Sequence, residues 1–352
     1  TFYGGILTSS KIILNSSLSQ KYEIIPLDST QNSNPPPNLL ARSAFAIRRI
    51  FILIFKLTMN RPNAALIFAS DGGSALEKGL MIWICNFFQC VTFIFPRAGN
   101  LINQTSNSSF MLKIIRLFYK SSTIFLCQGP KWKDYAINTL GINESKVKIV
   151  SNWTATKRQI QIGSDRSYEI SNAIPKILFV GWLEDFKGVF ELLNACKNLR
   201  NEGFEFHLTL AGKGDAEISA KKFVKNNKLE KYITFMGWVN SEGLENVLKN
   251  SNIFVLPSWS EGLPNAMIEA MPAGLAIVVT SVGTIPDFID HNKHGIIIPP
   301  QKTKNLENAL KILITDKSFR NELAKNAHNM AKKEFSSESS ISKLIETIEE
   351  VI

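Results

Sequence analysis

Two acidic side chains and one lysine in the C-terminal half of the sequence have the types and spacing to hold a polar, oxygen-rich ligand. Glu261 and Glu269 stand eight residues apart, and Lys187 lies in an earlier loop. A carboxylate accepts two hydrogen bonds at once, which suits a vicinal diol such as a ribose. A lysine ammonium near a helix start offers a point charge for phosphate. These residues together indicate chemistry on a phosphorylated, hydroxyl-rich small molecule.

The local sequence around the two acids predicts a strand, then a loop, then a helix. An apolar run precedes the loop, Pro264 suits the first turn of a helix, and Gly274 suits its end. Glu261 then lies in the loop, and Glu269 lies in the helix with Asn265 as its i,i+4 neighbour. The backbone N–H groups there suit electron-rich ligand atoms. The alternative, in which neither residue binds a ligand, is that Glu269 is a solvated helix residue and Glu261 a helix cap.

Glycine turns at strand ends accompany this element. Gly181 and Trp182 end one apolar run before Lys187, and Gly212 and Gly237 end two further runs. Glycine permits close approach of a ligand or a second backbone. A lone G-x-G turn is weak evidence for nucleotide binding, so these turns gain weight only from their order.

Short apolar runs alternate with amphipathic helical patterns through the C-terminal half. Continuous apolar strands separated by helices are typical of a parallel, doubly wound sheet that is buried on both faces. Ligands bind such sheets beyond the C-terminal ends of the strands. The predicted strands are 177–180, 206–210, 233–235, 253–256, 276–279 and 296–298, and the predicted helices are 188–199, 216–226, 241–249, 265–271, 286–289 and 304–314.

The N-terminal half shows a less regular α/β pattern. Proline at 35–37 excludes a helix or central strand there, and residues 80–95 read as a buried helix followed by a strand. A length of 352 residues predicts two domains. Further predicted helices are 44–58, 110–120 and 338–351, and further strands are 65–69, 92–95 and 123–127. The predicted domains are 1–160 and 176–335, with a linker at 161–175 and a final helix at 336–352 that packs locally or returns to the first domain.

The net charge of +10 lies entirely in the N-terminal half. Residues 1–175 hold 19 Lys/Arg and 8 Asp/Glu, a balance of +11, whereas residues 176–352 hold 21 and 22, a balance of −1. A basic surface attracts anionic partners such as nucleic acid, an acidic polymer or an anionic membrane face. Alternatively, the basic residues only keep an apolar domain in solution.

Cysteine usage and hydropathy predict a cytoplasmic protein. The four cysteines form neither a C-x-x-C pair nor a cluster with histidine, so we expect no disulfide framework and no zinc site. No signal peptide is visible at Thr1. The longest apolar stretch, 80–95, contains Asn86 and Gln89 and is short for a membrane span.

Taken in order, the C-terminal motifs resemble glycosyltransferase family 4, which consists of retaining group 1 glycosyltransferases with the GT-B fold. The family carries G-R-L…K-G, G-x-G, F-x-G, P-S…E-G-x-x-N with a second Glu eight positions on, and a G-x-x-E/D turn. The matches are Gly181 with Lys187-Gly188, Gly212 with Gly214, Phe235 with Gly237, Pro257-Ser258, Glu261-Gly262 with Asn265 and Glu269, and Gly283 with Asp287. They cover residues 176–300, but Trp182 replaces the family's arginine, which removes one of two phosphate cations, and Asp287 replaces the usual Glu.

The resemblance implies two Rossmann-like, doubly wound domains facing a central cleft, with the acceptor on the N-terminal domain and the nucleotide sugar on the C-terminal one. Lys187 would hold the diphosphate and Glu269 the ribose hydroxyls. Glu261 and the backbone of 262–265 would hold the transferred sugar, and Gly212 and Gly237 would border the base. The implied catalytic residues are Glu261 and Lys187, and the implied donor-binding residues are Gly181, Trp182, Lys187, Gly212, Gly237, Glu261, Gly262, Leu263, Pro264, Asn265 and Glu269.

In the N-terminal half the resemblance is looser. Gly4 and Gly5 are similar to the family's donor-facing glycine turn, although the strand that precedes it is absent, so we expect an N-terminally shortened chain. Arg97 follows a strand end at the place of a family histidine that contacts the donor sugar, but it would equally serve as an exposed structural residue. Asp71 lies in another strand-end turn. These four residues are the cleft candidates of this half.

The resemblance implies transfer of a hexose-type sugar, with retention, from a UDP-sugar or a GDP-sugar to a saccharide or lipid-linked saccharide in polysaccharide synthesis. No Asp-x-Asp pair occurs, so we expect no metal and no other cofactor. The expected partners are the donor, the acceptor and an anionic membrane contacted peripherally, but no nucleic acid. Two alternatives stay open: a nucleotide-sugar epimerase on the same fold, and a catalytically weak saccharide-binding homologue, which the missing arginine favours.

Overall fold

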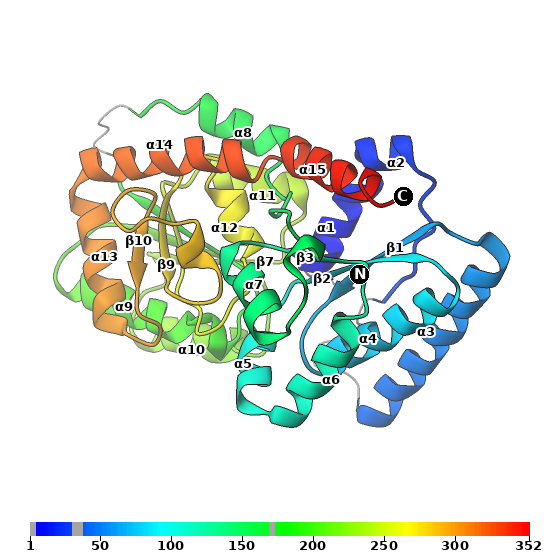
Figure 1. Cartoon of the computed structure of the whole chain (residues 1–352). Coiled ribbons are helices and arrows are strands. Elements are labelled where there is room, and N and C mark those ends of the chain that lie inside the picture. The colour runs from blue at the N-terminus through cyan, green and yellow to red at the C-terminus, as the bar shows by residue number, and fades with distance from the viewer. Residues whose placement is uncertain (1–4, 30–37, 169–172) are drawn as a thin grey trace. The chain divides into compact units, whose positions relative to one another are not determined.

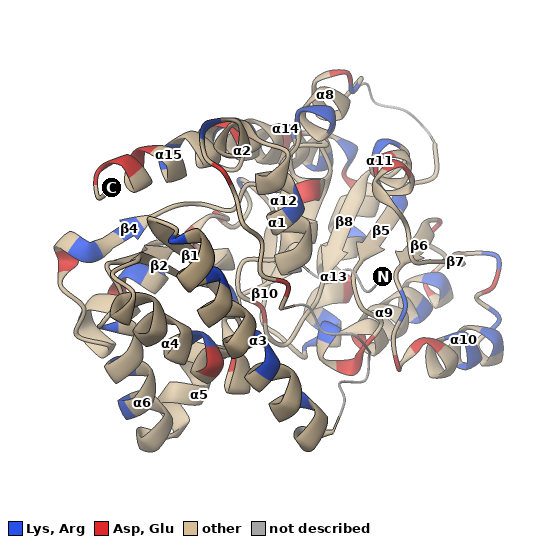
Figure 2. Cartoon of the chain, turned by 90° about the vertical axis from the view of Figure 1, so that its right-hand side faces the viewer, with Lys and Arg blue, Asp and Glu red and all other residues tan. Residues whose placement is uncertain are grey.

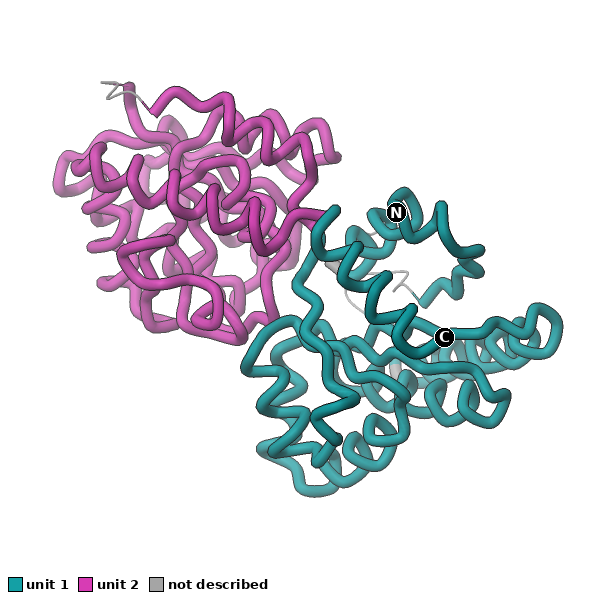
Figure 3. Tube along the Cα trace, turned by 45° about the horizontal axis from the view of Figure 1, so that its top comes forward, with its two compact units in different colours: residues 1–153, 338–352 teal, residues 154–337 magenta. Residues whose placement is uncertain are grey.

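The chain forms two compact units, which Figure 3 shows in different colours. The computed structural model describes residues 5–29, 38–168 and 173–352. Unit 1 contains Thr1–Trp153 together with Glu338–Ile352, and unit 2 contains Thr154–Ser337. The unit boundary therefore falls after Trp153 rather than in the segment 161–175, because α8 (Lys157–Ser164) packs on α11 and α14 of unit 2.

Unit 2 is built on a six-stranded parallel sheet with the order β10-β9-β8-β5-β6-β7 (Figure 1). Its strands are β5 (Lys176–Val180), β6 (His207–Ala211), β7 (Ile233–Gly237), β8 (Ile253–Leu256), β9 (Ala276–Thr280) and β10 (Ile296–Ile298). Its other elements are α8, η3 (Asp185–Lys187), α9 (Val189–Asn201), α10 (Glu217–Asn226), α11 (Ser241–Lys249), α12 (Asn265–Ala270), η4 (Ile285–Asp287), α13 (Thr303–Thr315) and α14 (Lys317–Glu334).

Strand β5 lies inside this sheet, and the chain builds outward from it in both directions. Strands β6 and β7 follow on one side, and β8, β9 and β10 follow on the other. Since crossovers between parallel strands are right-handed, this order puts helices on both faces. Every residue of β8 and β9 is buried, as expected for strands covered on both sides. The predicted doubly wound sheet is confirmed.

Unit 1 contains a four-stranded parallel sheet with the order β1-β2-β3-β4. Its strands are β1 (Ala64–Ala69), β2 (Val91–Pro96), β3 (Ile124–Cys127) and β4 (Val147–Ile149). Its helices are α1 (Gly5–Leu14), α2 (Ser17–Lys21), α3 (Leu39–Asn60), α4 (Gly72–Phe87), α5 (Asn100–Asn107), α6 (Ser109–Tyr119), α7 (Pro130–Asp134), η1 (Tyr135–Thr139), η2 (Glu144–Lys146) and α15 (Ser337–Glu349).

Alternate residues of the unit 1 sheet enter two separate cores. Ile94 of β2 joins a cluster with buried residues of α3, α4, α6 and α7. Its neighbours Phe93 and Phe95 join a second cluster with residues of α1, α2 and α15. Side chains of a strand alternate between faces, so the sheet is covered on both sides. The C-terminal helix α15 is thus part of the N-terminal unit.

Helix α4 and strand β2 span the segment read as a buried helix followed by a strand. The expectation of a buried helix is only partly correct, because Leu80, Trp83 and Phe87 are exposed on α4. These side chains point away from the sheet that α4 packs on. No helix of the described ranges has both the length and the apolarity to cross a membrane. The proline segment 35–37 lies outside the described residues.

Candidate functional site

The candidate residues of unit 2 gather at the point where its strand order reverses. Strand β5 pairs with β6 on one side and β8 on the other. The loop after β5 contains Lys187, and the loop after β8 contains Glu261. In open α/β sheets, ligands bind outside the carboxyl ends of the strands at such a point. The topology therefore brings two distant loops to one edge of the sheet.

The two loops are in direct backbone contact. Gly188 is in the left-handed conformation, with φ 73°, and a Cβ on it would lie 2.2 Å from the carbonyl oxygen of Pro257. The Trp259 N–H donates a hydrogen bond of 2.7 Å to the Phe186 carbonyl oxygen. Both the dihedral angle and the close approach require glycine at 188. Backbone contacts therefore set the distance between the loop after β5 and the loop after β8.

Lys187 and Glu261 form an ion pair across this contact. The Lys187 Nζ donates to Glu261 Oε1 over 2.7 Å, and the side chains are 16% and 10% exposed. An ammonium carries three N–H donors, so this bond leaves two of them for a ligand. The ammonium also lies 5.2 Å from the centre of the Phe186 ring. A cation and a carboxylate are thus held side by side, largely withdrawn from water.

A turn after β9 packs directly against the backbone of the loop that contains Glu261. Gly283, with φ 60°, approaches so closely that a Cβ would lie 2.2 Å from the Glu261 carbonyl oxygen. The Thr284 N–H and hydroxyl both donate to the Gly262 carbonyl oxygen, over 3.0 and 3.1 Å. The Gly262 carbonyl oxygen is therefore occupied, and the loop is fixed before any ligand arrives.

Glu269 lies on α12 and is buried together with its neighbours Met267 and Ile268. Burial raises the pKa of this carboxyl from 4.5 to about 8. Its carboxyl makes no hydrogen bond or ion pair within the described residues. A buried carboxyl without a partner is costly, and such groups mark functional sites. Helix α12 begins at Asn265 after Pro264, and Leu263 before it is buried.

The glycine turns lie against one another at the ends of β5, β6 and β7. A Cβ on Gly212 would lie 1.8 Å from the Gly181 carbonyl oxygen, which excludes any side chain there. The Trp182 and Trp238 rings lie 5.2 Å apart, with Trp238 directly after Gly237. Trp182, which stands in place of the family's arginine, therefore forms an aromatic pair with Trp238 at this edge.

Sequence reasoning missed two residues at this edge. Trp238 was passed over because an aromatic residue after a strand reads as core packing. Lys213 lies between two glycines, and its Cε is 3.5 Å from the position of a Cβ on Gly237. The sequence did offer a signal for Lys213, because a lysine between two glycines at a strand end can reach a ligand bound there. Lys213 is exposed, and it adds a cation next to the aromatic pair.

The candidates of unit 1 have different surroundings. Gly4 lies outside the described residues, and Gly5 begins α1. Asp71 precedes α4 and accepts a hydrogen bond of 2.8 Å from Asn100 Nδ2. The backbone N–H of Arg97 donates to the Ala69 carbonyl oxygen, so the ends of β1 and β2 are neighbours.

The Arg97 guanidinium points into an aromatic environment within unit 1. It lies 4.9 Å from the Phe95 ring and 5.0 Å from the Trp153 ring, and its Nη2 donates to Ser9 Oγ over 2.8 Å. Burial lowers the pKa of the guanidinium, and its Nη1 has no hydrogen-bond partner. Arg97 therefore holds α1 against the sheet through its ring contacts and the Ser9 bond.

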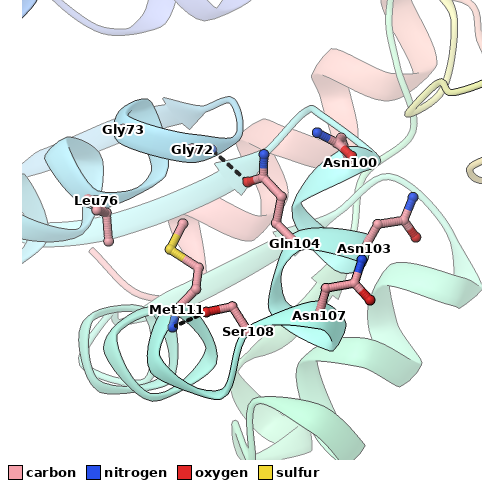
Figure 4. Close-up of a pocket in the computed structure, with 9 residues that line it drawn as sticks. All are labelled: Gly72, Gly73, Leu76, Asn100, Asn103, Gln104, Asn107, Ser108 and Met111. Carbon is pink, nitrogen blue, oxygen red and sulfur yellow. Dashed lines mark hydrogen bonds between the residues drawn. The ribbon is translucent and has the colours of Figure 1, made fainter. Parts of the chain in front are cut away.

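A cavity of about 500 Å³ lies beside Asp71, at the carboxyl end of the unit 1 sheet (Figure 4). The Gly72 N–H donates to Gln104 Oε1 over 2.8 Å and so ties α4 to α5. The carboxamides of Asn103 and Asn107 make no hydrogen bond within the described residues. The cavity is lined by Gly72, Gly73, Leu76, Asn100, Asn103, Gln104, Asn107, Ser108 and Met111. Its lining side chains are uncharged, and the surface that they expose to the hollow is mainly apolar.

The described residues contain no group of three or more His, Cys, Asp or Glu side chains placed to hold a metal ion. The four cysteines are free and buried. Metal independence of the chemistry stays a prediction.

Two parallel-sheet α/β units with a site at the switch point of the second define a GT-B protein. Residues 164–330 match the family described as Glycosyl transferases group 1. The matched segment lies within unit 2 and contains both Lys187 and Glu261.

Relatives that are named as glycosyltransferases match a longer part of the chain. The chain is 26% identical over 238 residues to an uncharacterized glycosyltransferase of Methanocaldococcus jannaschii, covering 66% of this chain and 60% of the relative. It is 25% identical over 233 residues to the UDP-Gal:alpha-D-GlcNAc-diphosphoundecaprenol alpha-1,3-galactosyltransferase of Escherichia coli, covering 62% and 59%. The chain thus spans about three fifths of the length of these relatives.

Among solved structures, HepE of Anabaena in complex with UDP-glucose is similar with a TM-score of 0.71 and 14% identity. The match covers 99% of this chain and 97% of that one. At this identity the likeness shows a shared fold, and it extends over both units.

Proposed function

We propose that this protein is a retaining glycosyltransferase of family 4 that transfers a hexose-type sugar from a UDP-sugar to a saccharide or lipid-linked saccharide. The observation that carries the proposal is the contact of Lys187 with Glu261, next to the β5–β8 switch point of a group 1 glycosyltransferase domain. The unpartnered carboxyl of Glu269 on the helix that follows supports it.

The donor would use the groups that the site leaves free. The two remaining N–H donors of Lys187 would bind the diphosphate, and Glu261 would accept a hydroxyl of the transferred sugar. Glu269 would accept the ribose hydroxyls, which supply the hydrogen bonds that its buried carboxyl lacks. In each case a hydrogen-bond donor meets an acceptor: the ammonium donates to phosphate oxygens, and the two carboxylates accept from hydroxyl groups.

In the transfer step, the bond between the anomeric carbon and the diphosphate oxygen breaks, and its electron pair leaves on that oxygen. The acceptor hydroxyl forms the new bond and gives up its proton to the departing diphosphate oxygen. Lys187 stabilises the negative charge that develops on the leaving group, in a site already withdrawn from water. We propose that this stabilisation needs no metal ion, and that the acceptor attacks the face from which the diphosphate leaves.

The edge formed by Gly212 and Gly237 would border the base. Trp182 and Trp238 provide aromatic faces there, and Lys213 provides a second cation near the place of the missing arginine. Stacking on an aromatic face favours a planar nucleobase. HepE, a structural neighbour, was solved in complex with UDP-glucose, which supports UDP as the nucleotide.

The cavity beside Asp71 is the proposed acceptor site. Its neutral carboxamides match the hydroxyl groups of a saccharide, and Leu76 and Met111 suit the apolar face of a sugar ring. The E. coli relative is named for a diphosphoundecaprenol-linked acceptor, which supports a lipid-linked saccharide. Peripheral contact of the basic N-terminal half with an anionic membrane fits such an acceptor.

Turnover of radiolabelled UDP-hexoses by the full chain tests this function. We expect release of UDP that depends on added saccharide or lipid-linked acceptor and persists in EDTA. The Asn103→Ala/Asn107→Ala variant should raise the acceptor KM and leave UDP affinity unchanged. Sugar interconversion without acceptor would indicate an epimerase, and donor binding without turnover would indicate a saccharide-binding homologue.

A further inference from the structure

The helices on one face of unit 1 expose apolar side chains at helical spacing. On α3, Ile47, Phe51, Phe55 and Met59 follow one another every four residues, and Phe51 and Phe55 are 68% and 64% exposed. Side chains at this spacing line one side of a helix. Single exposed apolar residues are ordinary, but a stripe along about three turns is not.

Helices α4 and α6 extend this stripe into a broader face. The apolar residues Leu80, Trp83 and Phe87 are exposed on α4, and Phe110 and Leu117 are exposed on α6. The Arg49 Nε donates to Glu77 over 2.6 Å, which joins α3 to α4. The Trp83 and Phe118 rings, 4.8 Å apart, join α4 to α6.

The three helices form one layer, so their exposed sides face the same way. Leu57 of α3, Ile82 of α4 and Ile115 of α6 all belong to the cluster that packs on the sheet. The residues on their opposite sides therefore share the outer surface of this layer. We call this surface the α3–α4–α6 face.

Basic side chains accompany the apolar ones on this face. Figure 2 shows Lys and Arg recurring along α3 and α6. Neither helix contains an Asp or Glu, and Glu77 of α4 is paired with Arg49. Exposed cations of α3 include Arg42 and Arg48, which form no ion pair within the described residues.

A basic groove on α6 adds a place for an anionic group. A hollow of about 440 Å³ is lined by Lys113, Arg116, Leu117, Lys120 and Ser121. The Arg116 Nη2 is positioned by a hydrogen bond of 2.6 Å to the Thr139 carbonyl oxygen. Lys113 and Lys120 form no ion pair in the described part of the chain.

We propose that the α3–α4–α6 face docks on an anionic lipid bilayer, with its apolar stripe in the headgroup–acyl boundary and the α6 groove on a lipid phosphate. A helix that combines aromatic and aliphatic residues on one side with Lys and Arg beside them lies in a membrane interface plane. Anionic headgroups complement the positive charge of the face. The docking rests on unit 1 alone and does not depend on the donor site of unit 2.

Flotation of the full chain with vesicles tests the proposal. We expect binding to vesicles that contain phosphatidylglycerol, weak binding to pure phosphatidylcholine, and a loss of binding at high salt because charge is screened. The Phe51→Ser/Phe55→Ser variant and the Lys113→Glu/Lys120→Glu variant should each lower the bound fraction at least fivefold. All four residues are exposed, so the fold should survive.

Matched controls lie on α10 of unit 2. Ile218→Ser is the apolar control and Lys222→Glu/Lys225→Glu the charge control, since these side chains are also exposed. Equal loss of binding in a control, or no vesicle binding by the parent chain, would overturn the proposal. A dimer that Phe51→Ser/Phe55→Ser abolishes, without vesicle binding, would make this face a self-association surface instead. Calorimetry with UDP separates the two proposals, because the α3 variant should keep full nucleotide affinity.

Discussion

Lys187 and Glu261 form an ion pair, but they would contact different parts of the donor. The ammonium would contact the diphosphate, which every UDP compound has, whereas the carboxylate would contact the sugar, which UDP lacks. Substitution of one residue or the other should therefore change the binding of different ligands.

We predict that Lys187→Ala lowers the affinity for both UDP and a UDP-hexose by about 10- to 100-fold. A hydrogen bond to a charged group contributes about 1.5–3 kcal/mol. Glu261→Gln should lower only the affinity for the UDP-hexose. Isothermal titration calorimetry with both ligands checks this, with Lys222→Ala on exposed α10 as control. Unchanged UDP binding in Lys187→Ala would contradict the phosphate role.

The raised pKa of Glu269 predicts that the protein becomes less stable as the pH rises. Its folded pKa, about 8, lies above its ordinary value of 4.5. Between these values the folded chain keeps a proton that the unfolded chain has released. The free energy of unfolding therefore falls as pH rises through this window, by up to ~1.4 kcal/mol per pH unit from this group.

We predict that Glu269→Gln stabilises unit 2 at pH 7.5 and removes this slope, since an amide is neutral without taking up a proton on folding. Urea unfolding at pH 5 to 8 measures both. The same variant should weaken UDP binding and abolish the rise in wild-type UDP affinity between pH 6 and 8, because ribose hydroxyls need the ionised acceptor. A variant with parental slope and affinity would show that Glu269 is not the ribose ligand.

Most candidate residues of unit 2 could be proposed from the sequence because their types follow from their chemistry. The pairing of Lys187 with Glu261 was not, since a contact across 74 positions depends on the order of strands. The burial of Glu269 was missed for a related reason. A lone helical Glu reads as solvated unless the surrounding layers are known.

At the scale of elements, the loop that carries Glu261 depends on the turn after β9. Both Gly283 and Gly203 have positive φ, at 60° and 87°, so alanine at either position costs about 1–2 kcal/mol in backbone energy. Only at Gly283 would the new Cβ also collide with the Glu261 carbonyl oxygen. Around Gly203, no atom lies within 4 Å of that position.

We predict that Gly283→Ala destabilises the protein more than Gly203→Ala and lowers UDP-hexose affinity at least tenfold. The excess over the control is the cost of moving the Glu261–Gly262 loop. Chemical unfolding and calorimetry on both variants supply the comparison. Equal effects of the two substitutions on binding would mean that the turn does not position this loop.

The strands of unit 2 were predictable because a sheet buried on both faces leaves continuous apolar runs. Helix α8 was not predicted, since its segment is polar. Its capping box, in which Thr156 and Gln159 bond each other's backbone N–H groups, was the readable signal. Strand β4 was missed because three residues give no periodicity. Helices α1 and α2 were also missed, and they lack an acidic first turn.

At the scale of the whole molecule, the last helix completes the first unit. Ile341, Leu344 and Ile348 of α15 are buried in the same cluster as Trp153 and Phe95. Sequence reasoning left open where this helix packs, because its apolar stripe would suit either sheet. The tertiary partner of an amphipathic helix is not encoded in the helix itself.

We predict that Leu344→Ala destabilises unit 1 by about 2–5 kcal/mol, the usual cost of removing a buried leucine side chain. Ser342→Ala, at an exposed position of α15, should have little effect. In calorimetric scans, the substitution should lower the transition of unit 1, while UDP should raise that of unit 2. A shift of the UDP-sensitive transition by Leu344→Ala would contradict this division.

Hydrogen–deuterium exchange of the full chain with saturating UDP tests the donor site most directly. The account predicts new protection in the backbone of 181–188 and 258–269, where the loops after β5 and β8 meet, and none in 100–111 beside the unit 1 cavity. Protection confined to other segments, or none with UDP bound, would contradict a nucleotide site at the switch point of unit 2.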